Sequence, residues 1–170
     1  MNRETLQGLQ APLKARYRED PSGALVTLRA EGALGDNVSC SVATGRALVE
    51  AGLHPATGGT GLQACSGDML LQALVACAGV TLSAVATSLG VSIRGGTLRA
   101  EGDLDFRGTL AVSKEAPVGF REIRLFIELD SDAPPEDQRK LLELTERYCV
   151  VFQTLNSKPE LKVAGVRRER

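Results

Sequence analysis

The hydrophobic positions of the chain follow two spacings, and each spacing predicts a type of secondary structure. Near the start, Val38, Cys40 and Val42 alternate with serines, which is typical of a strand that buries one face. Apolar runs on either side favour strands as well, so three strands are expected over residues 24–30, 38–42 and 47–51. Before them, residues 1–20 predict a short polar helix.

The longest apolar segment, residues 69–93, contains no charged residue and predicts a helix from Ser66 to Leu89. Ser66 is expected to cap this helix, with Asp68 in the first turn, where the helix dipole favours a carboxylate. The segment is long enough to cross a bilayer. We favour the central helix of a soluble domain, because polar side chains interrupt it and no aromatic anchors or basic cluster flank it.

The second half changes to a spacing of two, which predicts an antiparallel meander with one face in solvent. Its strands are expected over residues 97–106, 110–112 and 123–129. Prolines followed by acidic residues at 134–137 are typical of a helix start, and the apolar positions after them predict one helix to about Leu155. A last short strand is expected over residues 161–163.

Composition narrows the class of protein. The chain has 170 residues, of which 43% are hydrophobic and 24% charged, as in an ordinary globular protein of one domain. We expect a single domain over residues 1–170, with residues 1–22 as a lead-in. The net charge of -1, the 4% of aromatic residues and the lack of Trp argue against nucleic-acid binding. The N-terminal residues show no secretory signal, so a cytoplasmic location is expected.

The four cysteines are the strongest candidates for reactive residues. Cys40, Cys65, Cys77 and Cys149 are too few for a disulfide scaffold, and with one histidine, His54, and no CxxC they do not predict a metal site. Cys77 and Cys149 lie on the apolar faces of two predicted helices, where a thiol is either a small core residue or half of a redox pair. A redox pair requires a lowered thiol pKa and Cα atoms within about 7 Å of each other. Spacing alone does not choose between Cys77 and Cys65 as the reactive thiol, and His54, in a Pro/Gly loop, is expected to pack rather than act as a base.

Three motifs in a fixed order resemble the OsmC/Ohr family (osmotically inducible protein C and organic hydroperoxide resistance protein). They are a Gly-rich loop that leads into the apolar segment 66–77, which ends at Cys77; a strand pair around 117–124; and the segment 146–151, which contains Cys149. The resemblance covers residues 24–165. It implies an α+β fold in which antiparallel sheets wrap around long central helices in an intertwined homodimer.

The same resemblance implies a chemistry and assigns residues to it. The family's activity is thiol-dependent reduction of organic hydroperoxides in oxidative stress defence. Cys77 matches the reactive cysteine and Cys149 the resolving cysteine, whereas Cys40 and Cys65 match no catalytic position. The implied partners are a hydroperoxide and a dithiol or lipoyl-type reductant protein. No bound cofactor, no metal, no nucleic acid and no membrane are implied.

Departures from the family pattern leave an alternative open. The family usually carries a Glu at the entry of the central helix that holds a catalytic Arg, and here the shorter Asp68 stands one position away. Arg29 and Arg46 are both candidates for that Arg. The family usually places Pro after the resolving cysteine, and here Val150 follows Cys149. The alternatives are a non-catalytic OsmC-like dimer that binds a small apolar ligand and, in a third interpretation, a small membrane-anchored protein.

Overall fold

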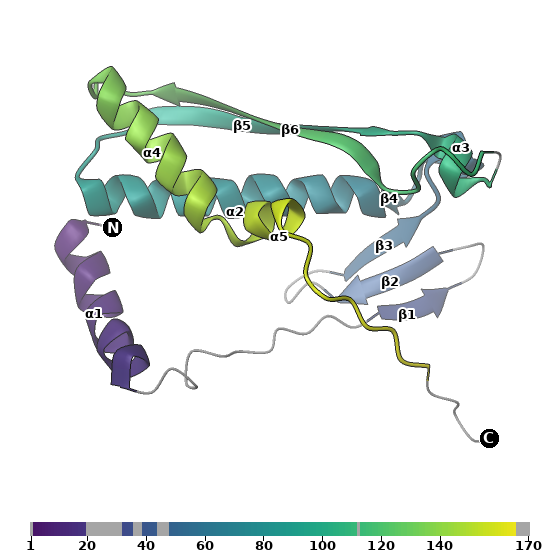
Figure 1. The fold of residues 1–170 in the computed structure, drawn as a ribbon, viewed down its shortest axis with the longest axis horizontal. Coiled ribbons are helices and arrows are strands. Elements are labelled where there is room, and N and C mark those ends of the chain that lie inside the picture. The colour runs from purple at the N-terminus through teal and green to yellow at the C-terminus, as the bar shows by residue number, and fades with distance from the viewer. Residues whose placement is uncertain (1, 20–31, 36–38, 44–47, 112, 166–170) are drawn as a thin grey trace.

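The computed structural model describes residues 2–19, 32–35, 39–43, 48–111 and 113–165. Figure 1 shows one long central helix with a two-stranded hairpin along one side and a second sheet at its N-terminal end. The helices in this part of the chain are α1 (Arg3–Glu19), α2 (Ser66–Leu89), α3 (Phe106–Thr109), α4 (Pro135–Tyr148) and α5 (Val150–Asn156), with the 3-10 turn η2 (Pro55–Thr57). The expected α+β class is confirmed.

The strands among the described residues form two separate sheets. One has the order β1-β2-β3-β4, from the strands β1 (Gly32–Gly35), β2 (Ser39–Ala43), β3 (Leu48–Gly52) and β4 (Ala64–Cys65). Its first two pairings are antiparallel, and the short β4 joins β3 in parallel just before α2 begins. The other sheet is the antiparallel hairpin of β5 (Gly95–Leu104) and β6 (Phe120–Asp130). The expected strands at 38–42 and 47–51 are confirmed within their described residues, and 24–30 lies outside the described residues.

The central helix has the predicted bounds but buries only one face. Its buried positions recur every four residues, as Leu74, Ala78, Leu82 and Ala86. This face packs against β5, β6, α4 and α5, and the contacts form two apolar clusters along the helix. By length and composition, this helix could also cross a membrane, and 22% of its most apolar 18-residue window is buried within the chain. A wide apolar surface of α2 is therefore left open.

The hairpin of β5 and β6 is longer and more regular than its sequence suggests. Its register runs from Gly95 opposite Asp130 to Leu104 opposite Phe120, with an irregularity at Asp103 and Leu104. Gly102 is needed here because a Cβ at that position would overlap the Phe120 ring. The outer face carries ion pairs between the strands, such as those of Arg124 with Asp103 and Glu101.

Four local predictions are wrong. The helix expected to run to Leu155 is interrupted at Cys149 and becomes α4 and α5. The strand expected at 110–112 is not formed over its described residues, since Asp105 accepts a bond from the Arg107 N–H and begins α3 instead. The segment 161–163 is exposed and adopts no strand. Cys65, rather than Ser66, occupies the N-cap of α2, without a side-chain bond.

Candidate functional site

The structure brings the two candidate thiols together. Cys77 lies in the middle of α2, and Cys149 lies at the junction of α4 and α5, yet both belong to one apolar cluster with Leu74 and Ala78. Cys149 is only 1% exposed, whereas Cys77 is half-buried. Both are free thiols, as is the half-buried Cys65. One member of the pair is therefore partly accessible, and the other is sealed behind it in the core.

The interruption at Cys149 explains how this residue reaches the core. Its backbone is extended, with φ -71° and ψ 109°, between two helical segments. The bonds on either side are kept, because the Cys149 N–H donates to the Thr145 carbonyl and the Gln153 N–H donates to the Cys149 carbonyl, both at 2.9 Å. The chain thus turns sharply at one residue and begins α5 beside α2. In a continuous helix the chain would not have changed direction at Cys149.

Hydrogen bonding favours the thiolate of Cys77. Burial raises the pKa of this thiol, but several donors around the sulfur act in the opposite direction. In order of effect they are the Val151 N–H, the Cys149 thiol, the Val150 N–H and the Thr81 hydroxyl. Together they hold the pKa of Cys77 below its ordinary value. Because these donors surround a partly accessible sulfur, Cys77 has the properties of a reactive thiol.

The partner thiol is shifted in the opposite direction. Burial raises the pKa of Cys149, the Phe152 N–H lowers it, and the bond that the Cys149 thiol donates to Cys77 raises it again. The net pKa of Cys149 lies above its ordinary value. The pair is therefore asymmetric, with Cys77 as the group that ionises first and Cys149 as the thiol that keeps its proton.

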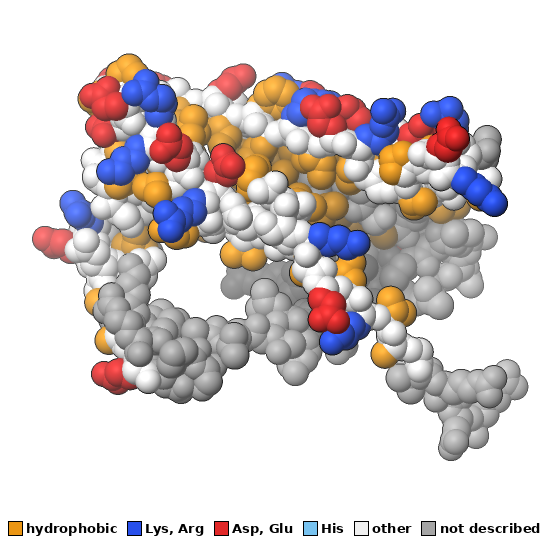
Figure 2. All heavy atoms as spheres, in the orientation of Figure 1, with side chains coloured by type: hydrophobic (Ala, Val, Ile, Leu, Met, Phe, Trp, Pro, Cys, Tyr) orange, Lys and Arg blue, Asp and Glu red, His pale blue; other side chains and the backbone are white. Residues whose placement is uncertain are grey.

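Two apolar cavities border this cluster on the side of β6. One, of about 470 Å³, is lined by Cys149, Ala78, Thr145 and Phe152. The other, of about 480 Å³, is lined by Leu74, Phe152 and residues at the start of β6. Phe152 contributes to both, and so stands between them. Figure 2 shows hydrophobic side chains gathered along this part of the molecule, between the hairpin and α5.

The other predicted residues lie elsewhere or outside the described residues. Asp68 is exposed in the first turn of α2 and lines a small cavity with Cys65 and His54, without Cys77. His54 stacks on Phe106 with ring centroids 4.9 Å apart, and its Nδ1 accepts a bond from the Ala56 N–H, so its expected packing role is confirmed.

Three further positions from the sequence analysis have limited or no structural description. The backbone of Cys40 pairs within β2, opposite Leu34 and Ala51, and its side chain lies outside the described part. Arg29 and Arg46 both lie outside the described residues. Among the residues that the structure describes, no cluster of His, Cys, Asp and Glu side chains is placed to bind a metal ion.

Sequence reasoning missed the donors around Cys77. Thr81 lies one turn after Cys77 on the same helix, a spacing that could have indicated a contact. The Val150 and Val151 N–H groups could not be recognised, because their position depends on a helix interruption that no residue type signals. Gln153, which bonds to the Glu146 carbonyl across this interruption, was missed for the same reason.

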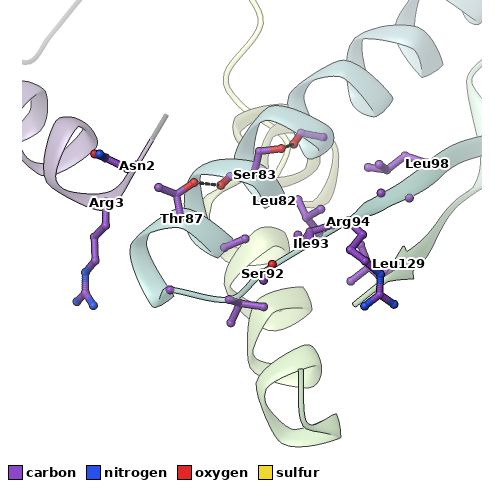
Figure 3. Close-up of a pocket in the computed structure, with 16 residues that line it drawn as sticks. Asn2, Arg3, Leu82, Ser83, Thr87, Ser92, Ile93, Arg94, Leu98 and Leu129 are labelled. Atoms are coloured by element: carbon purple, nitrogen blue, oxygen red, sulfur yellow. Dashed lines mark hydrogen bonds between the residues drawn. The ribbon is translucent and has the colours of Figure 1, made fainter. Parts of the chain in front are cut away.

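A further cavity, of about 770 Å³, lies away from the thiols (Figure 3). It is lined by the last turns of α2, the start of β5 and the first residues of α1, and it includes no cysteine. Arg94 at its edge is paired with Asp130 and Asp132, while Ser83 and Thr87 bond to carbonyls of their own helix. These polar groups are therefore already engaged within the chain.

The comparisons with known proteins agree on one family. The profile of the OsmC-like protein family matches residues 59–164. No curated protein matches the chain in sequence. Among solved structures, the OsmC like protein from Mycoplasma pneumoniae has a TM-score of 0.66 at 16% identity and covers 78% of this chain and 89% of its own.

Two organic hydroperoxide resistance proteins are similar in structure as well. The one from Elizabethkingia anophelis has a TM-score of 0.63 at 18% identity, covering 79% of this chain and 91% of its own. The one from Legionella pneumophila, described as a predicted redox protein, has a TM-score of 0.61 at 16% identity, covering 78% and 91%. At such identities the likeness establishes the fold.

Proposed function

The chain belongs to the OsmC-like protein family, and from this premise we propose that it is a thiol peroxidase that reduces organic hydroperoxides. The observation that carries the proposal is the asymmetric pair, in which Cys77 with a lowered pKa contacts the buried Cys149 thiol. Two structural neighbours that are organic hydroperoxide resistance proteins support the substrate class.

The proposed reaction begins at the Cys77 sulfur. Its thiolate attacks the distal oxygen of the hydroperoxide, the O–O bond breaks, and the alcohol leaves after taking up a proton, so that Cys77 becomes a sulfenic acid. The Cys149 sulfur then attacks the Cys77 sulfur, and water leaves with the hydroxyl of the sulfenic acid and the proton of Cys149. The product is a Cys77–Cys149 disulfide. Contact between the two side chains in one cluster shortens the path to this second step.

An external dithiol completes the cycle. It reduces the disulfide by thiol–disulfide exchange and is itself oxidised to a disulfide, so that both cysteines return as thiols. A small dithiol or a lipoyl-type reductant protein provides this chemistry, and no bound cofactor takes part in it. We propose the cytoplasm as the location, because such reductants are maintained in a reducing compartment.

The surroundings of the pair favour apolar substrates. The cavity beside Cys149 and the one beside Leu74 are lined mainly by aliphatic and aromatic side chains. A fatty or aromatic hydroperoxide buries its apolar group there, whereas hydrogen peroxide gains nothing from such a surface. We expect kcat/KM to be higher for cumene hydroperoxide than for hydrogen peroxide.

A peroxide-consumption assay with dihydrolipoamide as reductant tests this function. We expect turnover of cumene hydroperoxide by the unaltered protein, none by Cys77→Ser and undiminished turnover by Cys65→Ser, the matched control. Turnover retained in Cys77→Ser would overturn the assignment of the reactive thiol. A complete lack of turnover in the unaltered, fully reduced protein would overturn the peroxidase itself.

The open face of α2 supports an assembly of two copies. Opposite its buried stripe, α2 presents a row of small and apolar exposed side chains, Ala73, Ala76, Val80 and Ser83, with Val80 72% exposed. Such a charge-free helix face is unfavourable in water and is suited to packing against another helix. We propose that a second copy covers it, giving a homodimer with the central helices in contact.

The second candidate function is a non-catalytic dimer that binds a small apolar ligand. The two cavities beside Phe152 favour it, because a ligand could occupy them without any thiol chemistry. That function requires an ordinary or raised pKa for Cys77, whereas the pKa of Cys77 is lowered here. We therefore favour the peroxidase. A Cys77 that is alkylated no faster than a free cysteine would reverse this choice.

A further inference from the structure

The junction of α4 and α5 contains a hydrogen bond that a continuous helix would not have. In an α-helix the Glu146 carbonyl accepts from the N–H four residues later, which is that of Val150. Here the side-chain amide of Gln153 donates to the Glu146 carbonyl instead, at 2.9 Å. The backbone bonds of Cys149 and Gln153 on either side are intact. The Glu146 carbonyl therefore accepts from a side chain at the point where a continuous helix would use a backbone N–H.

The consequence of this replacement reaches Cys77. With the Glu146 carbonyl bonded to the side chain of Gln153, the Val150 N–H contributes to lowering the pKa of Cys77. The extended backbone of Cys149, with ψ 109°, keeps this arrangement, whereas a helical ψ near -42° would direct the Val150 N–H back to the Glu146 carbonyl. The same turn keeps the Cys149 side chain in the cluster with Cys77.

We propose that Gln153 is a positioning residue for the chemistry of Cys77, because its bond to the Glu146 carbonyl holds the chain open at Cys149. Gln153 does not touch the reacting atoms in this role; it acts through the backbone of Val150 and through Cys149. This inference rests on the proposed thiol function. It also explains why Val150, a residue with an N–H, follows Cys149 here, because a proline in its place would have no N–H to donate.

The first test replaces the amide of Gln153 without changing its size or helix propensity. In Gln153→Met we expect the midpoint of the pH profile for Cys77 alkylation by iodoacetamide to rise by about half a unit, so that alkylation at pH 7 slows about threefold. The rate is followed on the Cys77 peptide by mass spectrometry. Gln138→Met is the matched control, since Gln138 also donates to a carbonyl, that of Ala133 at 2.8 Å, at the other end of α4.

A second variant tests the same mechanism through the backbone. Val150→Pro removes the N–H itself, and the fold should tolerate it because residue 150 is the first of its helix and Cys149 before it is already extended. We expect the same slowing of Cys77 alkylation. If Gln153→Met does not fold, Val150→Pro alone tests whether the backbone at this junction sets the reactivity of Cys77.

The outcomes separate this inference from the peroxidase. A Cys77 profile unchanged in both Gln153→Met and Val150→Pro would overturn the positioning role, as would an equal shift in Gln138→Met. A shifted profile in the first two variants alone would support it. Because alkylation needs no peroxide, a protein without peroxidase turnover would refute the proposed function while leaving this measurement interpretable.

Discussion

Replacing Cys149 separates its packing from its contact with Cys77. The side chain is 1% exposed, so Cys149→Ala removes a sulfur from a closed core. The transfer term for a group of this size is about 0.8 kcal/mol. A cavity of about 20 Å³ adds about 0.5 kcal/mol. We therefore expect a loss of about 1–1.5 kcal/mol in the free energy of unfolding, measured by urea denaturation under reducing conditions.

The same substitution changes the reactivity of Cys77. Without the donor at position 149, the pKa of Cys77 is expected to rise, and its alkylation at neutral pH to slow. Cys149→Ser keeps a donor and should keep the lowered pKa. Neither variant can form the disulfide, so after one addition of hydroperoxide both should retain a Cys77 sulfenic acid that dimedone traps.

Cys65→Ala is the control for both measurements, because Cys65 lies before α2 and outside the thiol cluster. It should leave the Cys77 profile unchanged. Identical Cys77 profiles in Cys149→Ala and Cys149→Ser would refute the stabilising contact between the two thiols. A stability loss below about 0.3 kcal/mol in Cys149→Ala would refute its place in the core.

Three further predictions concern the fold and assembly. Gly102→Ala should lower the free energy of unfolding by about 1–3 kcal/mol, because its Cβ would displace the Phe120 ring; an unchanged urea midpoint would contradict this. A bond from Arg107 lowers the pKa of Asp105 to about 2, so this pair should stabilise the fold above the ordinary Asp pKa and lose its effect as the pH falls towards 2. Arg107→Gln should raise the Asp105 pKa in an NMR titration, and an unmoved titration would contradict the pairing. Val80→Glu should convert a dimer to a monomer in sedimentation, whereas a retained dimer would exclude the α2 face as the interface.

The long central helix and the hairpin could be predicted because their signals are strong and local. A segment without charged residues from 69 to 93 has few alternatives to a helix, and the predicted bounds Ser66–Leu89 are confirmed. Alternation likewise predicted β5 and β6 as antiparallel strands, but they pair directly because the strand expected between them at 110–112 is not formed over its described residues. The buried stripe of α2 runs through Ala78 and Leu82, because the partner elements, not the helix itself, decide which apolar face is covered.

The geometry of the thiol site could be predicted only in part. Apolar faces placed Cys77 and Cys149 on two packing helices, and the order of motifs assigned the pair. The interruption at Cys149 has no local signal, because the residues around it favour a helix and the break depends on tertiary bonds such as that of Gln153. The N–H groups of Val150 and Val151 at Cys77 follow from that break and could not be read from residue types.

The most direct measurement maps the sulfurs that become linked when the reduced protein meets a brief pulse of cumene hydroperoxide. Peptide mass spectrometry should find one disulfide, between Cys77 and Cys149, with Cys65 still a free thiol. Cys77 and Cys149 that both remain reduced after exposure, or oxidation that begins at Cys65, would contradict the account.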